Sequence, residues 1–323
     1  MREAEQMNPN DTYSDDEIDL RQLLQVLWEG KIIIILITAI AAISSVVYSL
    51  QLTNEYQSES IVIVRSNAQS QGMFSQYSGV ASMIGINLPA SGDNKALQAI
   101  EIIQSRKFVK QLLTFENILP SIMASKSYDS SSKELLFDQN IYDSETKIWT
   151  REPNKNGQKK PSYLQAHRVY MGMISISQEQ KTGFISIHIV HISPIFAKEF
   201  LELIIREANV LLRNRDMEES RKAIQYLKSE LSKTSLVEIR ESINALIEAQ
   251  LETQMLSQIN EDYVLVEIEP PFIPEQKSGP FRLPMVLLTT ILAGLLGAII
   301  ALVRHYLVRY YPFRQRDNKH TMV

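Results

Sequence analysis

Few residues in this sequence have the spacing that a chemical site requires. A phosphate-binding P-loop needs a glycine-rich turn ending in Gly-Lys-Ser or Gly-Lys-Thr, so that backbone N–H groups converge on the phosphates. The only Gly-Lys pair is Gly30-Lys31, and Ile32 follows it. The sequence contains no cysteine, which excludes disulfides, thiolate metal sites and cysteine nucleophiles. We therefore expect no nucleotide site of this type and no cofactor.

The histidines and carboxylates also fail to form a catalytic or metal-binding pattern. His188 and His191 are the closest of the five histidines, but residues three apart on a strand point to opposite faces of the sheet. The sequence has no Gly-x-Ser-x-Gly elbow and no His-Glu-x-x-His helix. Its net charge of −4 lacks the basic surplus of nucleic-acid-binding proteins. We predict a non-enzymatic protein without catalytic, cofactor-binding or metal-binding residues and without a nucleic-acid partner.

Two strongly apolar stretches of the 323-residue chain carry no charged side chain. They cover residues 32–54 and 283–303, and each has the length of about 20 residues that a helix needs to cross a bilayer core of about 30 Å. The sequence therefore predicts transmembrane helices at 32–53 and 283–303. They divide the chain into an N-terminal tail (1–31), a large middle domain (54–282) and a C-terminal tail (304–323).

Basic residues next to the two spans indicate the orientation. Lysine and arginine near span ends favour the cytoplasmic side. Such residues precede the first span and follow the second, so both tails are predicted to be cytoplasmic and residues 54–282 to be exported. In a bacterium this means a multi-pass protein of the inner membrane whose residues 54–282 are periplasmic. These residues are Lys31, Arg304, Arg309, Arg314, Arg316 and Lys319.

The N-terminal tail should contain a short amphipathic helix. Ser14 and Glu17 have the spacing of a capping box, and apolar residues follow at helical spacing. We expect Trp28 and Lys31 to lie at the level of the lipid headgroups.

Small residues stand four apart in the second span, in two overlapping pairs. This spacing lets helix backbones approach closely in lipid, where packing drives association. We predict a packing or partner contact at Ala293, Gly294, Gly297 and Ala298.

A proline-rich segment, residues 270–284, precedes the second span. Proline fixes φ and favours extended chain, so we predict a semi-rigid connector between domain and membrane. Its prolines are Pro270, Pro271, Pro274, Pro280 and Pro284.

The middle domain combines strand and helix patterns and predicts an α+β fold. An α/β base should form from residues 54–113, 163–192 and 262–269, with strands at 56–65 and 263–268, a β-hairpin at 173–177 and 183–191, and one helix at 96–113. Residues 120–162 are polar and irregular, and predict short helices and loops.

Residues 194–260 should form long helices, because no glycine or proline lies between Pro194 and Pro270. One straight helix would be about 100 Å long. We favour a hairpin, because Ser235 and Glu238 offer a second capping box and the chain must return to the membrane. The apolar side chains of these helices exceed what a small base can cover, which predicts a homo-oligomer. The alternative is that residues 96–172 cover them.

The arrangement as a whole resembles the Wzz chain-length determinant family, the bacterial polysaccharide co-polymerases. The resemblance lies in the order and spacing of short pieces between two terminal spans. The pieces are 16–20 (DEIDL) with Leu27, Trp28 and Lys31, 79–82 (GVAS), 99–106 (AIEIIQSR), 160–162 (KPS), 191–194 (HISP), 226–227 (YL), 246–248 (LIE) and the connector 270–284.

The resemblance implies a periplasmic α/β base with a long extended helical hairpin between two transmembrane helices, assembled into a bell-shaped ring. It also implies control of the chain length of a polysaccharide, usually lipopolysaccharide O-antigen, through a separate membrane polymerase of the Wzy type and the growing glycan. Some relatives carry a cytoplasmic tyrosine kinase. This chain resembles the kinase-free branch.

Two other functions fit the same sequence. A two-span adaptor or sensor for another polysaccharide or export system would have the same topology. A periplasmic glycan hydrolase or transferase would need a pair of carboxylates in a cleft.

Overall fold

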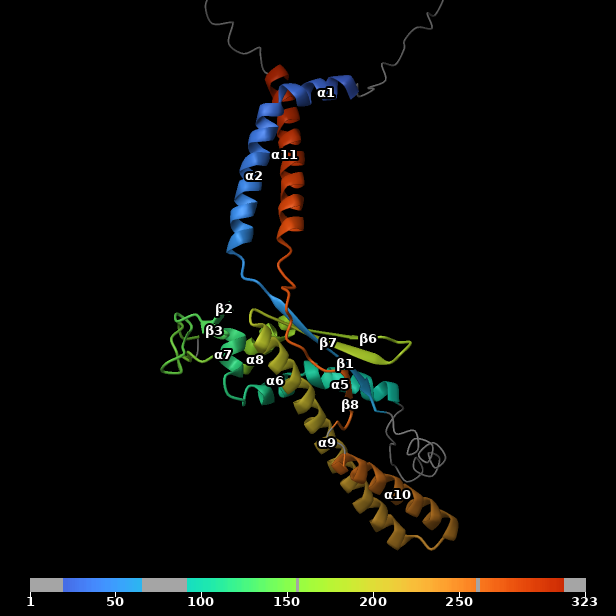
Figure 1. Ribbon diagram of the computed structural model, residues 1–323. Coiled ribbons are helices and arrows are strands. Elements are labelled where there is room, and N and C mark those ends of the chain that lie inside the picture. The colour runs from blue at the N-terminus through green and yellow to red at the C-terminus, as the bar shows by residue number, and fades with distance from the viewer. Residues whose placement is uncertain (1–19, 66–91, 155–156, 260–261, 311–323) are drawn as a thin grey trace, which may run out of the picture. The chain divides into compact units, whose positions relative to one another are not determined.

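The computed structural model describes residues 20–65, 92–154, 157–259 and 262–310 (Figure 1). The chain divides into two compact units, Met1–Leu52 with Pro280–Val323, and Thr53–Gly279. The predicted cap at Ser14 and Glu17 lies outside the described residues, as does the piece 79–82.

The described residues of the first unit form three helices. They are α1 (Leu20–Glu29), α2 (Lys31–Gln51) and α11 (Arg282–Tyr310). Lys31–Gln51 and Arg282–Leu307 are long and apolar enough to cross a membrane, and little of either is buried within the chain. This confirms the two predicted apolar helices near the termini. The second begins slightly earlier than expected, so Pro284 lies in its first turn, where proline is tolerated.

The second unit is built around a four-stranded antiparallel sheet with the order β6-β7-β1-β8. β6 and β7 form the predicted hairpin, and β1 and β8 confirm the other two predicted strands. Tyr56 pairs with His191 at one end of the β1–β7 ladder, and Ile63 pairs with Phe184 at the other. The strands are β1 (Tyr56–Val64), β6 (Ile174–Gln178), β7 (Phe184–His191) and β8 (Leu265–Glu269).

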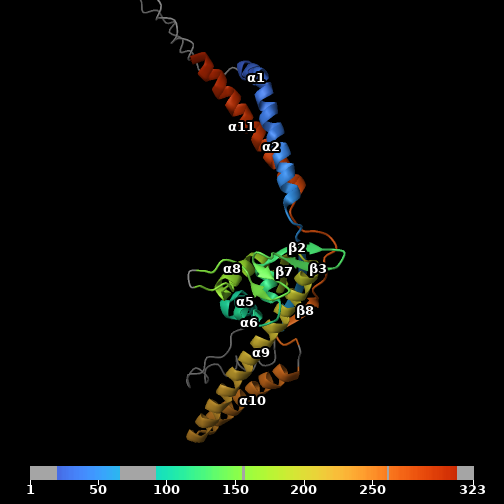
Figure 2. The ribbon, with the colours of Figure 1, turned by 90° about the vertical axis from the view of Figure 1, so that its left-hand side faces the viewer.

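The core lies between one face of this sheet and several helices (Figure 2). β7 alternates strictly, so that Ile185, Ile187 and Ile189 are buried while the intervening side chains are half-buried. The covering helices are α5 (Gly92–Gln104), α6 (Arg106–Leu112), α8 (Tyr163–Met173) and the first half of α9 (Pro194–Lys233).

The prediction of one helix over 96–113 was wrong. The chain breaks at Ser105, whose backbone is extended and whose Oγ accepts a hydrogen bond from the N–H of Phe108 at 3.1 Å. Ser105 is therefore the N-cap of α6. A serine inside an apolar helical pattern favoured the cap over continuation of the helix.

The region predicted as short helices and loops contains two small hairpins as well as α7 (Ile118–Met123). Each hairpin turn begins at an aspartate, Asp129 or Asp143, that accepts hydrogen bonds from the turn. Each ends at a lysine with positive φ, Lys133 or Lys147. The hairpin strands are β2 (Ser125–Asp129), β3 (Glu134–Phe137), β4 (Tyr142–Asp143) and β5 (Ile148–Trp149).

The long helices form the favoured hairpin, with α9 (Pro194–Lys233) followed by α10 (Val237–Ile259). Ser193 caps α9 by accepting a hydrogen bond from the N–H of Phe196 at 3.2 Å. Figure 1 shows that the second half of α9 and all of α10 project from the base as a pair. This pair has its own small core, formed by Leu227, Ile243, Leu246 and Ala249.

The apolar side chains of α9 are covered mostly within the chain. The stripe from Phe200 to Leu212 packs on the sheet, α5 and α6, and Ile224 is buried farther along the helix. The premise that a small base could not cover these side chains was therefore wrong. The alternative was that residues 96–172 cover these side chains. It holds for the first half of α9, which is covered in part by helices from this range.

Asn209 fixes the point where the chain returns from the hairpin to the sheet. It is 3% exposed. Its side-chain oxygen accepts hydrogen bonds from the N–H groups of Val264 (3.0 Å) and Leu265 (2.8 Å), and its amide donates to the carbonyl of Leu265 at 2.9 Å. A buried amide that satisfies three backbone groups sets the start of β8.

Two turns along α9, a polar contact completes this attachment. Asp216 accepts a hydrogen bond from the Tyr263 hydroxyl at 2.8 Å and pairs with Lys95 of α5 at 3.1 Å. Burial, and then the Asp216 carboxylate, raise the pKa of Tyr263. The tyrosine therefore remains a hydrogen-bond donor.

His191 joins the end of β7 to α7. Its Nδ1 accepts a hydrogen bond from the N–H of Ser193, so its Nε2–H donates to the carbonyl of Ser121, both at 3.1 Å. Burial lowers the pKa of His191 from 6.5 to about 4, because a buried ring resists charging. His188 lies half-buried on the opposite face of the sheet, as predicted.

This geometry predicts acid sensitivity. Between pH 6.5 and about 4 the unfolded chain binds a proton at His191 that the folded chain does not, so the free energy of unfolding should fall as the pH falls, by up to about 3 kcal/mol. Denaturant unfolding of the full chain in detergent at pH 7 and pH 4.5 measures this. The His191→Gln variant should lose this part of the pH dependence, whereas His188→Gln should keep it. An equal pH dependence in wild type and His191→Gln would contradict the assignment.

Candidate functional site

The helices α2 and α11 run antiparallel and pack closely against each other. A Cβ atom added at Gly297 would lie 3.2 Å from Cα of Ile34, and one added at Gly294 would lie 3.3 Å from Cγ2 of Thr38. At both distances a larger side chain would force the helices apart. The structure therefore places both predicted glycines against the other apolar helix of the same chain. The neighbouring Ala293 and Ala298 are half-buried.

The contact extends beyond the predicted residues. The hydroxyls of Ser45 and Thr289 form an interhelical hydrogen bond of 2.7 Å, and Arg282 donates to the carbonyl of Leu52 at 3.0 Å. At the far end, a Cβ on Gly30 would lie only 2.6 Å from Cβ of Ala301. Hydrogen bonds between helices add to close packing in lipid, where apolar contact alone gives no advantage over lipid tails.

The sequence carried a signal for these missed residues. Thr289, Ala293, Gly297 and Ala301 are small and stand four apart, a longer series than the two pairs recognised in the sequence. The residues of α2 that face this series are harder to identify from the sequence, because Ile34 is large and Gly30 precedes the span. Gly30 connects α1 to α2. It lies so close to Ala301 that a side chain at this position would clash.

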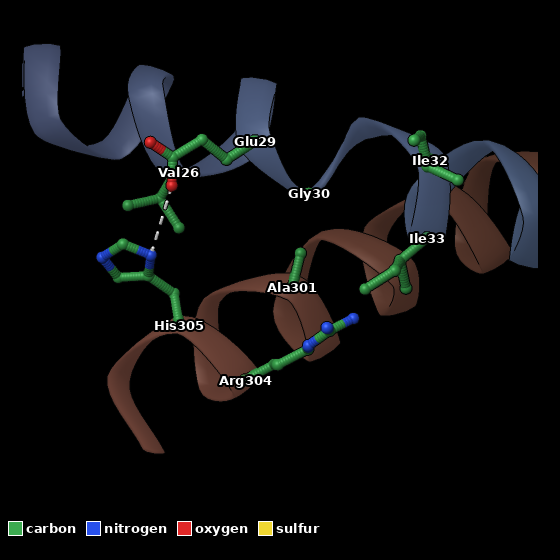
Figure 3. Close-up of a pocket in the computed structure, with 8 residues that line it drawn as sticks. All are labelled: Val26, Glu29, Gly30, Ile32, Ile33, Ala301, Arg304 and His305. Carbon is green, nitrogen blue, oxygen red and sulfur yellow. Dashed lines mark ion pairs between the residues drawn. The ribbon is translucent and has the colours of Figure 1, made fainter. Parts of the chain in front are cut away.

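A pocket of about 630 Å³ lies where α1, α2 and α11 meet (Figure 3). Figure 3 shows Glu29 and His305 facing each other across it, with 3.7 Å between Oε2 and Nδ1. The carboxylate of Glu29 and the guanidinium of Arg304 are its charged groups, beside His305. The other lining residues are Val26, Gly30, Ile32, Ile33 and Ala301.

The predicted connector prolines are divided between the two units. Pro271 and Pro274 are buried against the second unit, where the Ser58 hydroxyl donates to the carbonyl of Phe272 at 2.8 Å. Residues 278 and 279 bond to Glu55, the residue before β1. The first part of the segment is therefore docked on the second unit. Pro270 is exposed, Pro280 is half-buried, and Pro284 belongs to α11.

The helical hairpin exposes one apolar stripe. Leu251, Met255 and Ile259 follow each other at intervals of four on α10 and are 46%, 60% and 72% exposed. We call these three residues the outer α10 stripe. Leu236 and Val237 are exposed at the tip of the hairpin. An exposed row of large apolar side chains indicates an interaction surface.

Glu267 on β8 is a half-buried carboxylate. Burial, and then the charges of Asp262 and Glu202, raise the pKa of Glu267 on β8, while Lys198 opposes the shift. In the part of the chain that the structure describes, no three histidine, aspartate or glutamate side chains gather as a metal site. The described residues provide packing contacts and polar contacts between helices.

A search of solved structures found a full-length bacterial polysaccharide co-polymerase, with 14% identity and a TM-score of 0.41, covering 93% of this chain and 100% of that one. It also found a fragment of WzzB, a polysaccharide co-polymerase from Salmonella Typhimurium, with 13% identity and a TM-score of 0.32, covering 70% and 100%. Among curated proteins, no sequence matched.

The family assignment comes from a sequence comparison. The sequence model of the Wzz family, described as chain length determinant protein, matches residues 16–114. This segment contains α1, α2, β1, α5 and α6, and so includes the first apolar helix and the start of the base. The match confirms the resemblance: residues 16–114 of this chain carry the sequence signature of the Wzz chain length determinant family.

Proposed function

We propose that this protein regulates the chain length of a bacterial polysaccharide, in particular lipopolysaccharide O-antigen, as an oligomeric inner-membrane scaffold for a separate Wzy-type polymerase. The observation that carries the proposal is the match of residues 16–114 to the chain length determinant family. The scaffold itself would not catalyse polymerisation. It would hold the polymerase and the growing glycan.

The two apolar helices and their flanking charges support a membrane location. If α2 and α11 cross the inner membrane, the basic residues at their ends, Lys31 and Arg304, favour a cytoplasmic location of both termini. Residues 54–282 are then periplasmic. The antiparallel contact of α2 and α11 is the arrangement that such a topology requires.

The outer α10 stripe supports self-assembly. Most apolar side chains of α9 are already covered within the chain, so the argument for an oligomer depends on the residues that remain exposed. Leu251, Met255 and Ile259 lie on one face of a projecting helix. We propose that each copy buries this stripe against a neighbouring copy, which would form a ring of helical hairpins.

The polymerase contact would use the exposed side of α11. Gly294 and Gly297 face α2, so their role would be to hold the helix pair together. Leu292, Leu295 and Ile299 are exposed along α11. Their position fits a contact with the membrane-embedded polymerase.

Deleting the gene tests the proposed function. The polysaccharide should still be made, but its length distribution should lose its preferred length, and a plasmid copy of the gene should restore it. Gel electrophoresis of the glycan measures the distribution. Loss of all polymer would indicate an enzyme. An unchanged profile would indicate an adaptor or sensor for another system.

Changing the outer α10 stripe tests the assembly. Met255→Glu combined with Ile259→Glu would place two charges in the proposed interface, where unpaired charge is costly, and should shift the full-length protein toward the monomer. Light scattering in detergent measures the mass of the complex. Gln225→Glu adds a charge at an exposed position of α9, outside the outer α10 stripe, and should leave the mass unchanged. An unaltered oligomer in the double variant would exclude this interface.

A further inference from the structure

The pocket between α1, α2 and α11 lies where both apolar helices end. Lys31 directly precedes the charge-free run of α2, and Arg304 directly follows that of α11. Arg282 and Arg304 are 22 positions apart on one helix, which corresponds to about 33 Å along its axis, close to the thickness of a bilayer core. If α2 and α11 cross a bilayer, as proposed above, the pocket is at the level of the lipid headgroups.

The pocket presents one positive and one negative group. Arg304 forms no hydrogen bond or ion pair with any residue that the structure describes. Glu29 pairs with His305 at 3.7 Å, longer than a hydrogen bond, so the carboxylate can still accept one. A guanidinium binds phosphate well. A carboxylate repels a purely anionic headgroup but accepts hydrogen bonds from an ammonium group.

An apolar face of α2 continues from the same pocket. Ile32 belongs to both, and Ile35, Ile40 and Ile43 on this face are 62%, 58% and 66% exposed. The face runs from Ile32 to Ile43, which is about 16 Å along the helix and matches one leaflet of a bilayer core. Polar groups at the headgroup level thus adjoin an apolar helix face with the length of an acyl chain.

We propose that this site binds a phospholipid with an ethanolamine headgroup. Arg304 binds the phosphate, Glu29 accepts hydrogen bonds from the primary ammonium, and one acyl chain lies along the apolar face of α2 that begins at Ile32. A choline headgroup has no N–H donor for Glu29. A glycerol headgroup has no cation to offset the carboxylate.

The lipid preference of the full-length protein tests this proposal. Native mass spectrometry in detergent would compare phosphatidylethanolamine, phosphatidylcholine and phosphatidylglycerol with identical acyl chains at equal concentration. The wild type should bind phosphatidylethanolamine about tenfold more tightly than the other two, as expected for one charge-assisted contact. Glu29→Gln should remove the preference over phosphatidylcholine, and Arg304→Gln should weaken the binding of all three.

Lys31→Gln is the matched control. Lys31 lies at the same level, but its ammonium is 4.7 Å from the centre of the Trp28 ring, and it does not line the pocket. This variant should keep the wild-type preference, and circular dichroism would show that all variants retain their helices. Equal binding of the three lipids by the wild type, an equal loss in Lys31→Gln and Arg304→Gln, or displacement by a polyprenyl phosphate would each overturn the proposal.

The same preparation separates this inference from the proposed function. A protein that needs detergent but shows no lipid preference would refute only the lipid site. A protein that stays monodisperse without detergent would refute the membrane assignment on which the site depends.

Discussion

The close contact between α2 and α11 is the interaction on which the rest of the account depends. In lipid, two apolar helices gain nothing by hiding from water, so they associate only where their surfaces fit closely or form hydrogen bonds. Both conditions are met, by Gly297 against Ile34 and by Ser45 with Thr289. The two ends of the intervening domain also lie close together. Glu55, just before β1, bonds to Gly279, just before the second apolar segment.

The intervening domain meets a second requirement, which is to support a projecting helical hairpin. The first half of α9 is buried on the sheet, and its second half leaves the base. The projecting hairpin has only a small core of its own, so it would change its orientation easily if its end at the base were not held in place. Asn209 and Asp216, seven residues apart on α9, bind the chain that returns from α10. The direction of the hairpin is therefore set by buried polar contacts as well as by apolar packing.

Much of this structure could be predicted from the sequence where a pattern is local and regular. The alternation in β7 and the Ser193-Pro194 helix start gave correct elements. The small hairpins were missed because strands of two to five residues leave no periodicity to detect. Their signal was the repeated turn sequence, YDSSSK at 128–133 and YDSETK at 142–147. In both, the aspartate binds turn N–H groups and the lysine takes a positive φ.

The candidate sites were predictable only in part, for a different reason. Gly294 and Gly297 predict a close approach of another helix. The residues that they contact, Thr38 and Ile34, lie in the other apolar helix and have no special spacing. Likewise, Glu29 and Arg304 are far apart in sequence, and only the meeting of three helices makes them neighbours. The degree of burial of α9 was misjudged because the covering side chains come from several short elements. Contacts between residues that are far apart in the sequence can be identified only once the fold is known.

The most direct test of the central claim uses the absence of cysteine in this chain. Ser45→Cys and Thr289→Cys would replace two hydroxyls that are 2.7 Å apart. Oxidation of the double variant in native membranes should give a disulfide within one chain, detected as a faster-migrating monomer on a non-reducing gel. Ser44→Cys with Thr289→Cys should give none, because Ser44 is exposed on the other side of α2. Disulfide-linked dimers without the internal bond, or equal cross-linking of both pairs, would contradict the account.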